Sequence, residues 1–278
     1  MSRCSQAIVN AVALLSVTIA GCSGNGNTAT DSSNPNSEGT LVLVANGEDF
    51  VRQGFVTKDD WQLDFERVAV NVGNITAYQT ETTFDPEQNT EINATEKVTI
   101  LDEAKTIDLA EATPDDEAVA VETITVPTGS YNALGWSMIP AEDSQLGNPT
   151  IVLQGQAVKD SETIDFNLGF TVPMQYLCGE FVGDTRKGIV QQNEEAQIEM
   201  TFHFDHIFGD RDTASDDPLN QDALGFQPLA DLAQSGVLEV DWQTLQQQLS
   251  TEDAQLLTEA IVGLGHVGEG HCKAENEV

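Results

Sequence analysis

Apolar and polar residues alternate along much of the chain, and a period of two is typical of half-buried β-strands. The apolar residues occupy odd positions over 61–65 and even positions over 68–72. An alternation that slips by one residue without a turn predicts a β-bulge near Glu66 and Arg67. We therefore expect a strand with a bulge in this segment.

Further strand-like runs follow at short intervals, with Gly, Pro and Asn between them, and helical crossovers of the βαβ type are missing from this part of the sequence. Many short alternating strands of this kind indicate an antiparallel sandwich or barrel. We expect a mainly β fold, an antiparallel β-sandwich over 40–208. Its further strands are expected at 40–45, 97–101, 118–126, 131–139, 150–158, 163–170 and 196–205.

The pattern changes in the last quarter of the sequence. Residues 209–221 form an acidic loop, and beyond it the apolar residues follow helical spacing. Ser250 and Asp253 resemble the capping box that begins a helix. We expect 209–278 to consist of the acidic loop and short C-terminal helices packed on the sandwich.

The first residues resemble the signal of a bacterial lipoprotein. Residues 7–20 are mostly apolar, and Ile19-Ala20-Gly21-Cys22 is similar to the lipobox, in which a signal peptidase cleaves before a diacylated cysteine. The resemblance implies a signal peptide over 1–21, lipidation of Cys22, and a flexible, polar tether over 22–39. An ordinary secretory signal that contains a cysteine is the alternative.

The lipobox resemblance also implies a location. The residue after the cysteine is Ser23 and not Asp. By similarity to enterobacterial sorting, this favours the outer membrane. The expected protein is held in the bacterial cell envelope by its lipid anchor and faces the periplasm or the cell surface.

Charge excludes one class of partner. The chain has 46 acidic and 11 basic residues, a formal net charge of −35, and loss of Arg3 with the signal peptide would deepen the charge to −36. A broad basic face for nucleic acid or anionic lipid is absent, so we expect no nucleic-acid partner. The acidic excess fits cation binding, a salty habitat or solubility and names no activity.

Two cysteines remain once Cys4 is removed and Cys22 is lipidated. In an oxidising envelope compartment Cys178 and Cys272 most simply form a disulfide. Free thiols or metal ligation are the alternatives. A disulfide would hold the C-terminus beside the segment around Tyr176.

A second resemblance concerns the fold. Ile107-Asp108-Leu109, followed by Val126-Pro127-Thr128-Gly129-Ser130-Tyr131 and an apolar strand, is similar to a module of secreted bacterial prealbumin-like domains found in uncharacterised lipoprotein families. The resemblance implies a sandwich in which the turn around Gly129 leads into a strand at the edge of a sheet. It implies no activity, since sandwiches host many functions.

The four histidines form two close pairs, His203 with His206 and His266 with His271. Short-spaced histidine pairs are typical of transition-metal sites. Strand alternation places His203 and Asp205 on the polar face, and His206 can join them only if the strand ends or bends near Asp205. The predicted ligands are the four histidines with Asp205 in support, for zinc first and copper second. Capping or mobile histidines without metal are the alternative.

Three further sets of residues could carry chemistry. The acidic loop could hold calcium but departs from the EF-hand pattern, so a solvated loop is expected. The methionines could ligate copper and the tryptophans could bind sugar, although core packing is favoured for both sets. These sets are Asp210, Asp212, Asp216 and Asp217; Met138, Met174 and Met200; and Trp61, Trp136 and Trp242.

The sequence favours binding over catalysis. It has no G-x-S-x-G elbow, no P-loop and no H-E-x-x-H helix, so we expect no enzyme. The leading hypothesis is an envelope lipoprotein that binds a transition metal and exchanges it with an envelope transporter or receptor. The alternatives are a structural or adhesion-type surface lipoprotein without a metal, and a small-molecule-binding accessory of an outer-membrane receptor.

Overall fold

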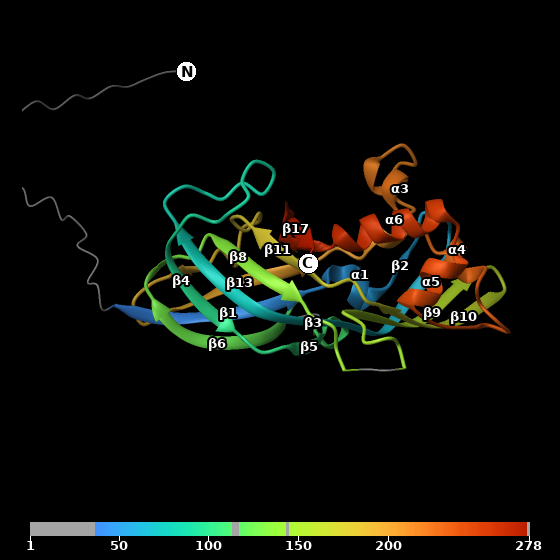
Figure 1. Ribbon diagram of the computed structural model, residues 1–278, viewed down its shortest axis with the longest axis horizontal. Helices are drawn as coiled ribbons and strands as arrows, with labels where there is room; N and C mark the ends of the chain where they lie inside the picture. The colour runs from blue at the N-terminus through green and yellow to red at the C-terminus, as the bar shows by residue number, and fades with distance from the viewer. Residues whose placement is uncertain (1–36, 113–116, 143–144, 277–278) are drawn as a thin grey trace, which may run out of the picture. The chain divides into compact units, whose positions relative to one another are not determined.

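The computed structural model describes residues 37–112, 117–142 and 145–276 (Figure 1). The predicted signal peptide, the predicted lipidation site Cys22 and nearly all of the predicted tether lie outside these residues. Within them, no helix is both long enough and apolar enough to cross a membrane. The described residues fall in one compact unit that the contacts delimit as 35–278.

A five-stranded sheet has the strand order β16-β15-β13-β1-β6. β1 runs parallel to β13 over seven residue pairs, from Thr40 opposite Glu195 to Asn46 opposite Thr201, and antiparallel to the edge strand β6. The bounds are Glu38–Asn46 for β1, Val119–Pro127 for β6, Glu195–Phe202 for β13, Gly265–Val267 for β15 and Gly270–His271 for β16.

A ten-stranded sheet has the order β14-β10-β9-β3-β8-β11-β17, and β2, β4 and β5 also pair with the long strand β3. A small pair, β7 and β12, lies beside these sheets. The bounds are Phe55–Val56 (β2), Gln62–Thr80 (β3), Ala94–Leu101 (β4), Lys105–Asp108 (β5), Gly129–Ser130 (β7), Ala133–Met138 (β8), Ile151–Lys159 (β9), Glu162–Phe170 (β10), Met174–Cys178 (β11), Ile189–Val190 (β12), Val237–Asp241 (β14) and Lys273–Asn276 (β17).

The mainly β prediction is confirmed, but the expectation of an antiparallel fold is wrong. β1 pairs in parallel with β13, and β10 in parallel with β14. Parallel neighbours need a long connection, and both pairs have one, because each partner lies far along the chain. Alternation along a strand shows which face is buried and carries no information on the direction of the next strand.

The predicted bulge is present in β3. The pairing of β3 with β9 shifts register between Phe65 and Arg67. The extra residue moves the inward face from odd to even positions, so that Leu63 before it and Val68 after it are both fully buried.

One hydrophobic core joins the two sheets. It contains Leu43 of β1 and Phe202 of β13 from the first sheet, and Val70 of β3 and Trp136 of β8 from the second. The three methionines that were expected to pack in the core, Met138, Met174 and Met200, are buried in it. Trp61 and Trp136 are completely buried and Trp242 packs against the core, as core packing requires.

The helices α3 to α6 lie together on one side of the molecule, near β9 and β10 (Figure 1). The predicted capping box begins α6, where the Ser250 hydroxyl accepts from the Asp253 backbone N–H at 3.1 Å, and Gly263 ends the helix. The bounds are Glu48–Gln53 (α1), the 3-10 turn Leu109–Glu111 (η1), Asp205–Phe208 (α2), Pro218–Asp222 (α3), Gln227–Ala230 (α4), Trp242–Gln248 (α5) and Thr251–Val262 (α6).

The C-terminal segment is only partly helical, which corrects the expectation for 209–278. It also contributes β14, β15, β16 and β17 to the two sheets. The predicted disulfide is confirmed: Cys178 at the end of β11 is bonded to Cys272, with the two Cα atoms 4.4 Å apart. It holds the last strands beside β11, where β17 pairs over four residues.

Candidate metal centre

The strand β13, which leads to the first histidine pair, ends earlier than the sequence predicts. β13 stops at Phe202, and the chain turns at once, with the His206 backbone N–H donating to the His203 carbonyl at 3.2 Å. The expectation of a strand to Asp205, with His203 and Asp205 on one strand face, is wrong. The turn into α2 provides the bend that His206 needs to reach the same site as His203.

The second pair comes from a hairpin that follows α6. β15 pairs with β13 so that His266 lies opposite Thr201, and β16 pairs with β15 so that His271 lies opposite His266. The His203 backbone N–H donates to the Leu264 carbonyl at 3.1 Å, which joins the two segments just before the site. The glycine-rich tail therefore forms strands and brings both pairs together.

The four imidazoles form one cluster. The His203 and His266 rings are stacked, with centroids 4.0 Å apart and planes 9° apart. The His266 and His271 centroids lie 4.4 Å apart, those of His206 and His266 5.1 Å, those of His203 and His206 5.6 Å, and those of His206 and His271 6.1 Å. His203, His206 and His266 can each offer one ligand atom within 4.8 Å of the other two.

A second group involves a residue that the sequence did not single out. Glu48, His203 and Asp205 also offer ligand atoms within 4.8 Å of one another. Glu48 begins α1, and its Oε1 lies 3.6 Å from His203 Nε2. The predicted Asp205 is therefore grouped with Glu48 and His203, while His206 and His266 belong to the other group.

Several donor atoms at this site are buried without a hydrogen-bond partner. In the described part of the chain, five buried side-chain polar atoms have none, and three of them are His203 Nε2, His266 Nδ1 and Asp205 Oδ1. Such atoms are rare because desolvation without a hydrogen bond costs about 1–3 kcal/mol. A bound cation would remove this cost for each of these atoms that it contacts.

Hydrogen bonds to the backbone orient the rings. His266 Nε2 lies 3.2 Å from the Gly263 carbonyl, and a carbonyl can only accept, so Nε2 carries the proton and Nδ1 keeps its lone pair. Metal-binding histidines commonly have this arrangement, in which the second nitrogen donates to a carbonyl. Gly263 is also the C-cap of α6, whose partial negative charge favours a cation.

Burial sets the charge state of the cluster. Desolvation lowers the pKa of His203 to about 4, and it lowers the pKa values of His206 and His266 as well. It raises the pKa of Asp205, and it raises the pKa of Glu48 to about 7. The imidazoles of His203, His206 and His266 are therefore neutral near pH 7, which is the form that binds metals.

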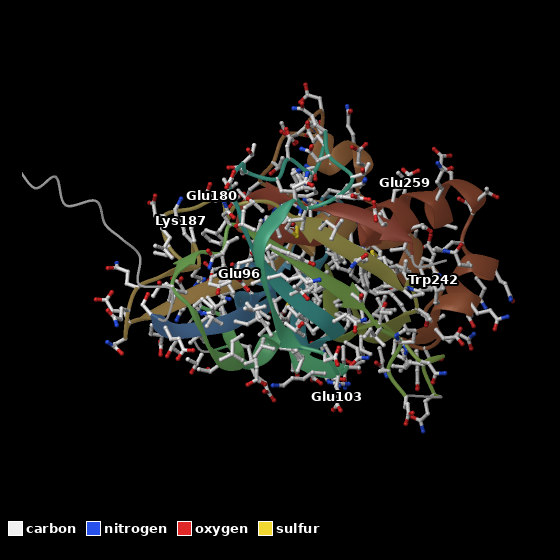
Figure 2. All side chains as sticks on the ribbon, turned by 60° about the vertical axis from the view of Figure 1, so that its left-hand side comes forward. Glu96, Glu103, Glu180, Lys187, Trp242 and Glu259 are labelled. Carbon is white, nitrogen blue, oxygen red and sulfur yellow. A yellow bond between two sulfur atoms is a disulfide. The ribbon has the colours of Figure 1, made fainter. Side chains whose placement is uncertain are left out.

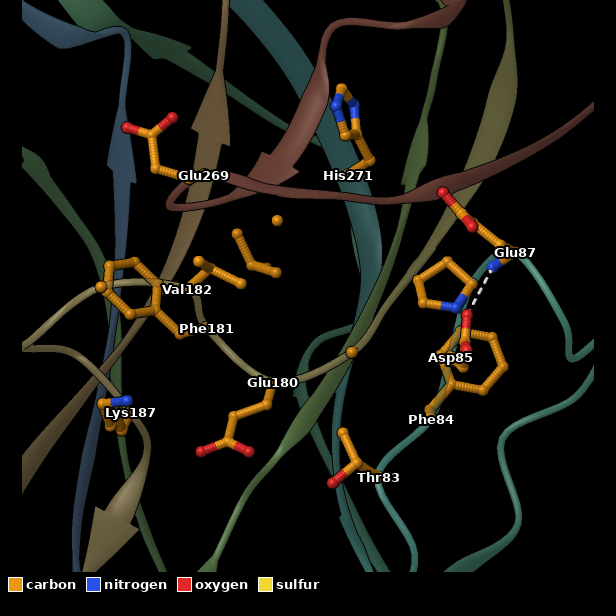
Figure 3. A pocket seen from close by; sticks show the side chains of 15 residues that line it. Thr83, Phe84, Asp85, Glu87, Glu180, Phe181, Val182, Lys187, Glu269 and His271 are labelled. Atoms are coloured by element: carbon orange, nitrogen blue, oxygen red, sulfur yellow. Dashed lines mark hydrogen bonds between the residues drawn. The ribbon is translucent and has the colours of Figure 1, made fainter.

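The cluster is accessible from solvent through His271. His206 and His271 line a cavity of about 430 Å³ together with Asp222 and Glu259. On its other side, His271 lines a cavity of about 800 Å³, with Glu269 near it on the same segment (Figure 3). Both cavities have carboxylates in their walls, so cations would be attracted towards His271.

The other candidate residues lie outside this cluster. In the acidic loop, the Asn220 side chain donates to the carbonyls of Asp210, Thr213 and Ala214. Among the described residues, the two groups above are those whose geometry could hold a metal, and they include none of the loop aspartates.

Carboxylates are widely distributed over the surface. Glu96 of β4, Glu103, Glu180 and Glu259 of α6 come from separate parts of the chain (Figure 2). Distributed charge of this kind attracts cations without selecting among them.

Comparison of the chain with protein-family models, with curated proteins and with solved structures found no match.

Proposed function

We propose that the protein binds a transition-metal ion, zinc first and copper second, through His203, His206 and His266. His271 is the solvent-exposed fourth imidazole, and Asp205 supports the site. The observation that carries the proposal is the set of buried donor atoms without a partner, of which His203 Nε2 and His266 Nδ1 belong to the ligand histidines.

The distances between the ligand atoms fit a site without an ion, whose histidines would move closer together on binding a metal. Zinc binds imidazole nitrogens at about 2.0–2.1 Å, so two ligand nitrogens of a tetrahedral ion lie about 3.4 Å apart. The histidine ligand atoms lie within 4.8 Å of one another. The stacked rings of His203 and His266 must turn out of their parallel arrangement, because each lone pair lies in the plane of its ring.

The proposed setting is the bacterial cell envelope. The lipobox-like residues 19–22 support a lipid anchor at Cys22, and a disulfide between Cys178 and Cys272 fits an oxidising compartment. We propose that the two sheets form a β-sandwich and that the protein binds metal without catalysis. Its partner would be an envelope transporter or receptor that exchanges the ion.

Metal analysis of the full exported chain, purified with its disulfide intact, tests the proposal. After loading with zinc and dialysis, the wild type should retain zinc, and the His206→Ala, His266→Ala double variant should lose the ion held by the histidines. The Asp216→Asn, Asp217→Asn variant is the control for non-specific attraction, and it should retain zinc like the wild type. Circular dichroism and the mass of the oxidised chain check that each variant is folded.

Equal and negligible zinc in the wild type and in the histidine variant would refute the metal-binding function. A structural or adhesion-type lipoprotein would then be the better interpretation. Copper(I) titrated under the same conditions decides between the two metals by its relative affinity for the histidine cluster.

A further inference from the structure

We infer that the centre holds a second cation, bound by Glu48, His203 and Asp205 beside the histidine position. The inference rests on the proposed function, because the second position shares His203 with the first. It differs in its donors: one imidazole and two carboxylates replace the all-imidazole set. This donor set suits a borderline or harder divalent cation, such as zinc or manganese.

Unpartnered donor atoms point to this position. His203 is 7% exposed and Asp205 is 8% exposed, yet His203 Nε2 and Asp205 Oδ1 have no hydrogen-bond partner. His203 Nε2 lies 3.6 Å from Glu48 Oε1, beyond hydrogen-bond distance. The three ligand atoms lie within 4.8 Å of one another, so small side-chain movements would bring all three into contact with one cation.

The backbone at Glu48 is strained in the conformation that directs its carboxylate to His203. Glu48 has φ of 61°, in the left-handed region that non-glycine residues rarely adopt. Its N–H donates to Asn46 Oδ1 at 2.8 Å, and Asn46 Oδ1 also accepts from Arg52 at 3.0 Å. Strain of about 1–3 kcal/mol that neighbours hold in place is typical of functional positions.

The cationic residue nearest to Glu48 in the sequence is Arg52, whose charge favours ionised Glu48 but whose side chain pairs with other groups. Arg52 forms its ion pair with Asp49 at 2.7 Å and donates to Asn46 and to the Glu117 carbonyl. Repulsion from Asp205, Glu269 and Glu199 adds to burial in raising the pKa of Glu48. Two acidic side chains, Glu48 and Asp205, lie beside His203, and a cation between them would favour their ionised, metal-binding form.

Two positions explain the arrangement better than one. The first group contains only imidazoles, and the second contains both carboxylates, so His203 alone belongs to both. With His203 bound to the second cation, His271 would have to move towards His206 and His266 to complete the first position, since its ring centroid lies 6.1 Å and 4.4 Å from theirs. One cation would then be held by His206, His266 and His271, and the other by Glu48, His203 and Asp205.

Zinc stoichiometry tests the inference on the full exported chain. Isothermal titration after removal of metal should give two equivalents for the wild type and one for Glu48→Gln. Glu269→Gln is the matched control, because it removes the same charge near the site but no proposed ligand, and it should keep two. Asp205→Asn is a second variant of the same position, and it should also give one.

The outcomes separate the second position from the proposed function. One equivalent in the wild type, or two in Glu48→Gln, refutes the second position. If that single ion is lost in the His206→Ala, His266→Ala variant, the proposed function stands without the inference. No bound zinc in any protein refutes both. Loss of all zinc in Glu48→Gln also refutes the second position, because Glu48 would then belong to a single shared site.

Discussion

The disulfide between Cys178 and Cys272 is expected to contribute about 4–5 kcal/mol to the free energy of unfolding. Its two cysteines are 94 residues apart in the sequence. In the chain-entropy model, a bond that closes a loop of this length lowers the entropy of the unfolded chain by an amount that corresponds to about 4–5 kcal/mol at 25 °C. The Cys178→Ala, Cys272→Ala double variant removes this constraint.

The native state should change much less than the unfolded state. Without the disulfide, β17 still pairs with β11 over four residues, and the Tyr176 hydroxyl still donates to the Ile261 carbonyl at 3.1 Å. The unfolded chain, freed of its crosslink, becomes more expanded. We therefore expect a larger dependence of the free energy of unfolding on urea in the variant, together with a lower value in water.

Equilibrium urea unfolding, followed by the fluorescence of the buried tryptophans, measures both quantities. Wild type reduced by a thiol is the matched control, because it loses the bond and keeps every side chain. The reduced protein and the double variant should agree within about 1 kcal/mol, the scale of the transfer term for two small buried side chains. Equal stability of the oxidised and reduced wild type would refute the loop-entropy argument.

Three further changes have defined outcomes. In Gly265→Ala, the new Cβ would lie 2.6 Å from the ring of the buried Tyr176, so thermal unfolding should show a loss of about 1–3 kcal/mol and zinc titration a weaker histidine site. Ser250→Ala removes the cap of α6 and should cost about 1 kcal/mol in urea unfolding, whereas Ser250→Asp should not. In metal-free protein, the contribution of His203 to stability should be full above pH 6.5, its unfolded pKa, and be lost by up to about 1.4 kcal/mol per pH unit towards its folded pKa of about 4. Glu48, with its pKa raised to about 7, contributes the opposite slope between pH 4.5 and 7 in both proteins, so wild type should lose more stability than His203→Ala between pH 6.5 and 4, and an equal change in both would contradict the burial argument.

The parts of the fold that follow from side-chain alternation were predictable. The switch of parity around Glu66 located the bulge of β3, and Ser250 with Asp253 located the start of α6. Strand direction was not predictable, because β1 and β13 are parallel partners separated by most of the chain. The strand β15 was missed because it is short and begins with a glycine, which lacks the usual strand signal: Gly265 is required by the close approach of the Tyr176 ring.

The histidine cluster was predictable in its members and only partly in its geometry. Two close pairs among four histidines, together with the disulfide, were enough to expect that they meet. Alternation extended β13 through His203 to Asp205, because Phe204 continues the apolar pattern and is fully buried, although it lies in the turn before α2. Burial of a residue does not distinguish a strand from the turn that follows it.

Glu48, unlike Asp205, could not be recognised as a candidate ligand in so acidic a sequence. The chain has 46 acidic residues, and solvated surface carboxylates are screened by water and salt, so spacing alone does not mark a ligand. Burial distinguishes Asp205, and backbone strain distinguishes Glu48, and both follow only from tertiary structure. Glu48→Gln and Glu269→Gln change the formal charge equally. A difference between them in bound zinc would therefore show that selection comes from desolvated, fixed donors, whereas the net charge only attracts cations.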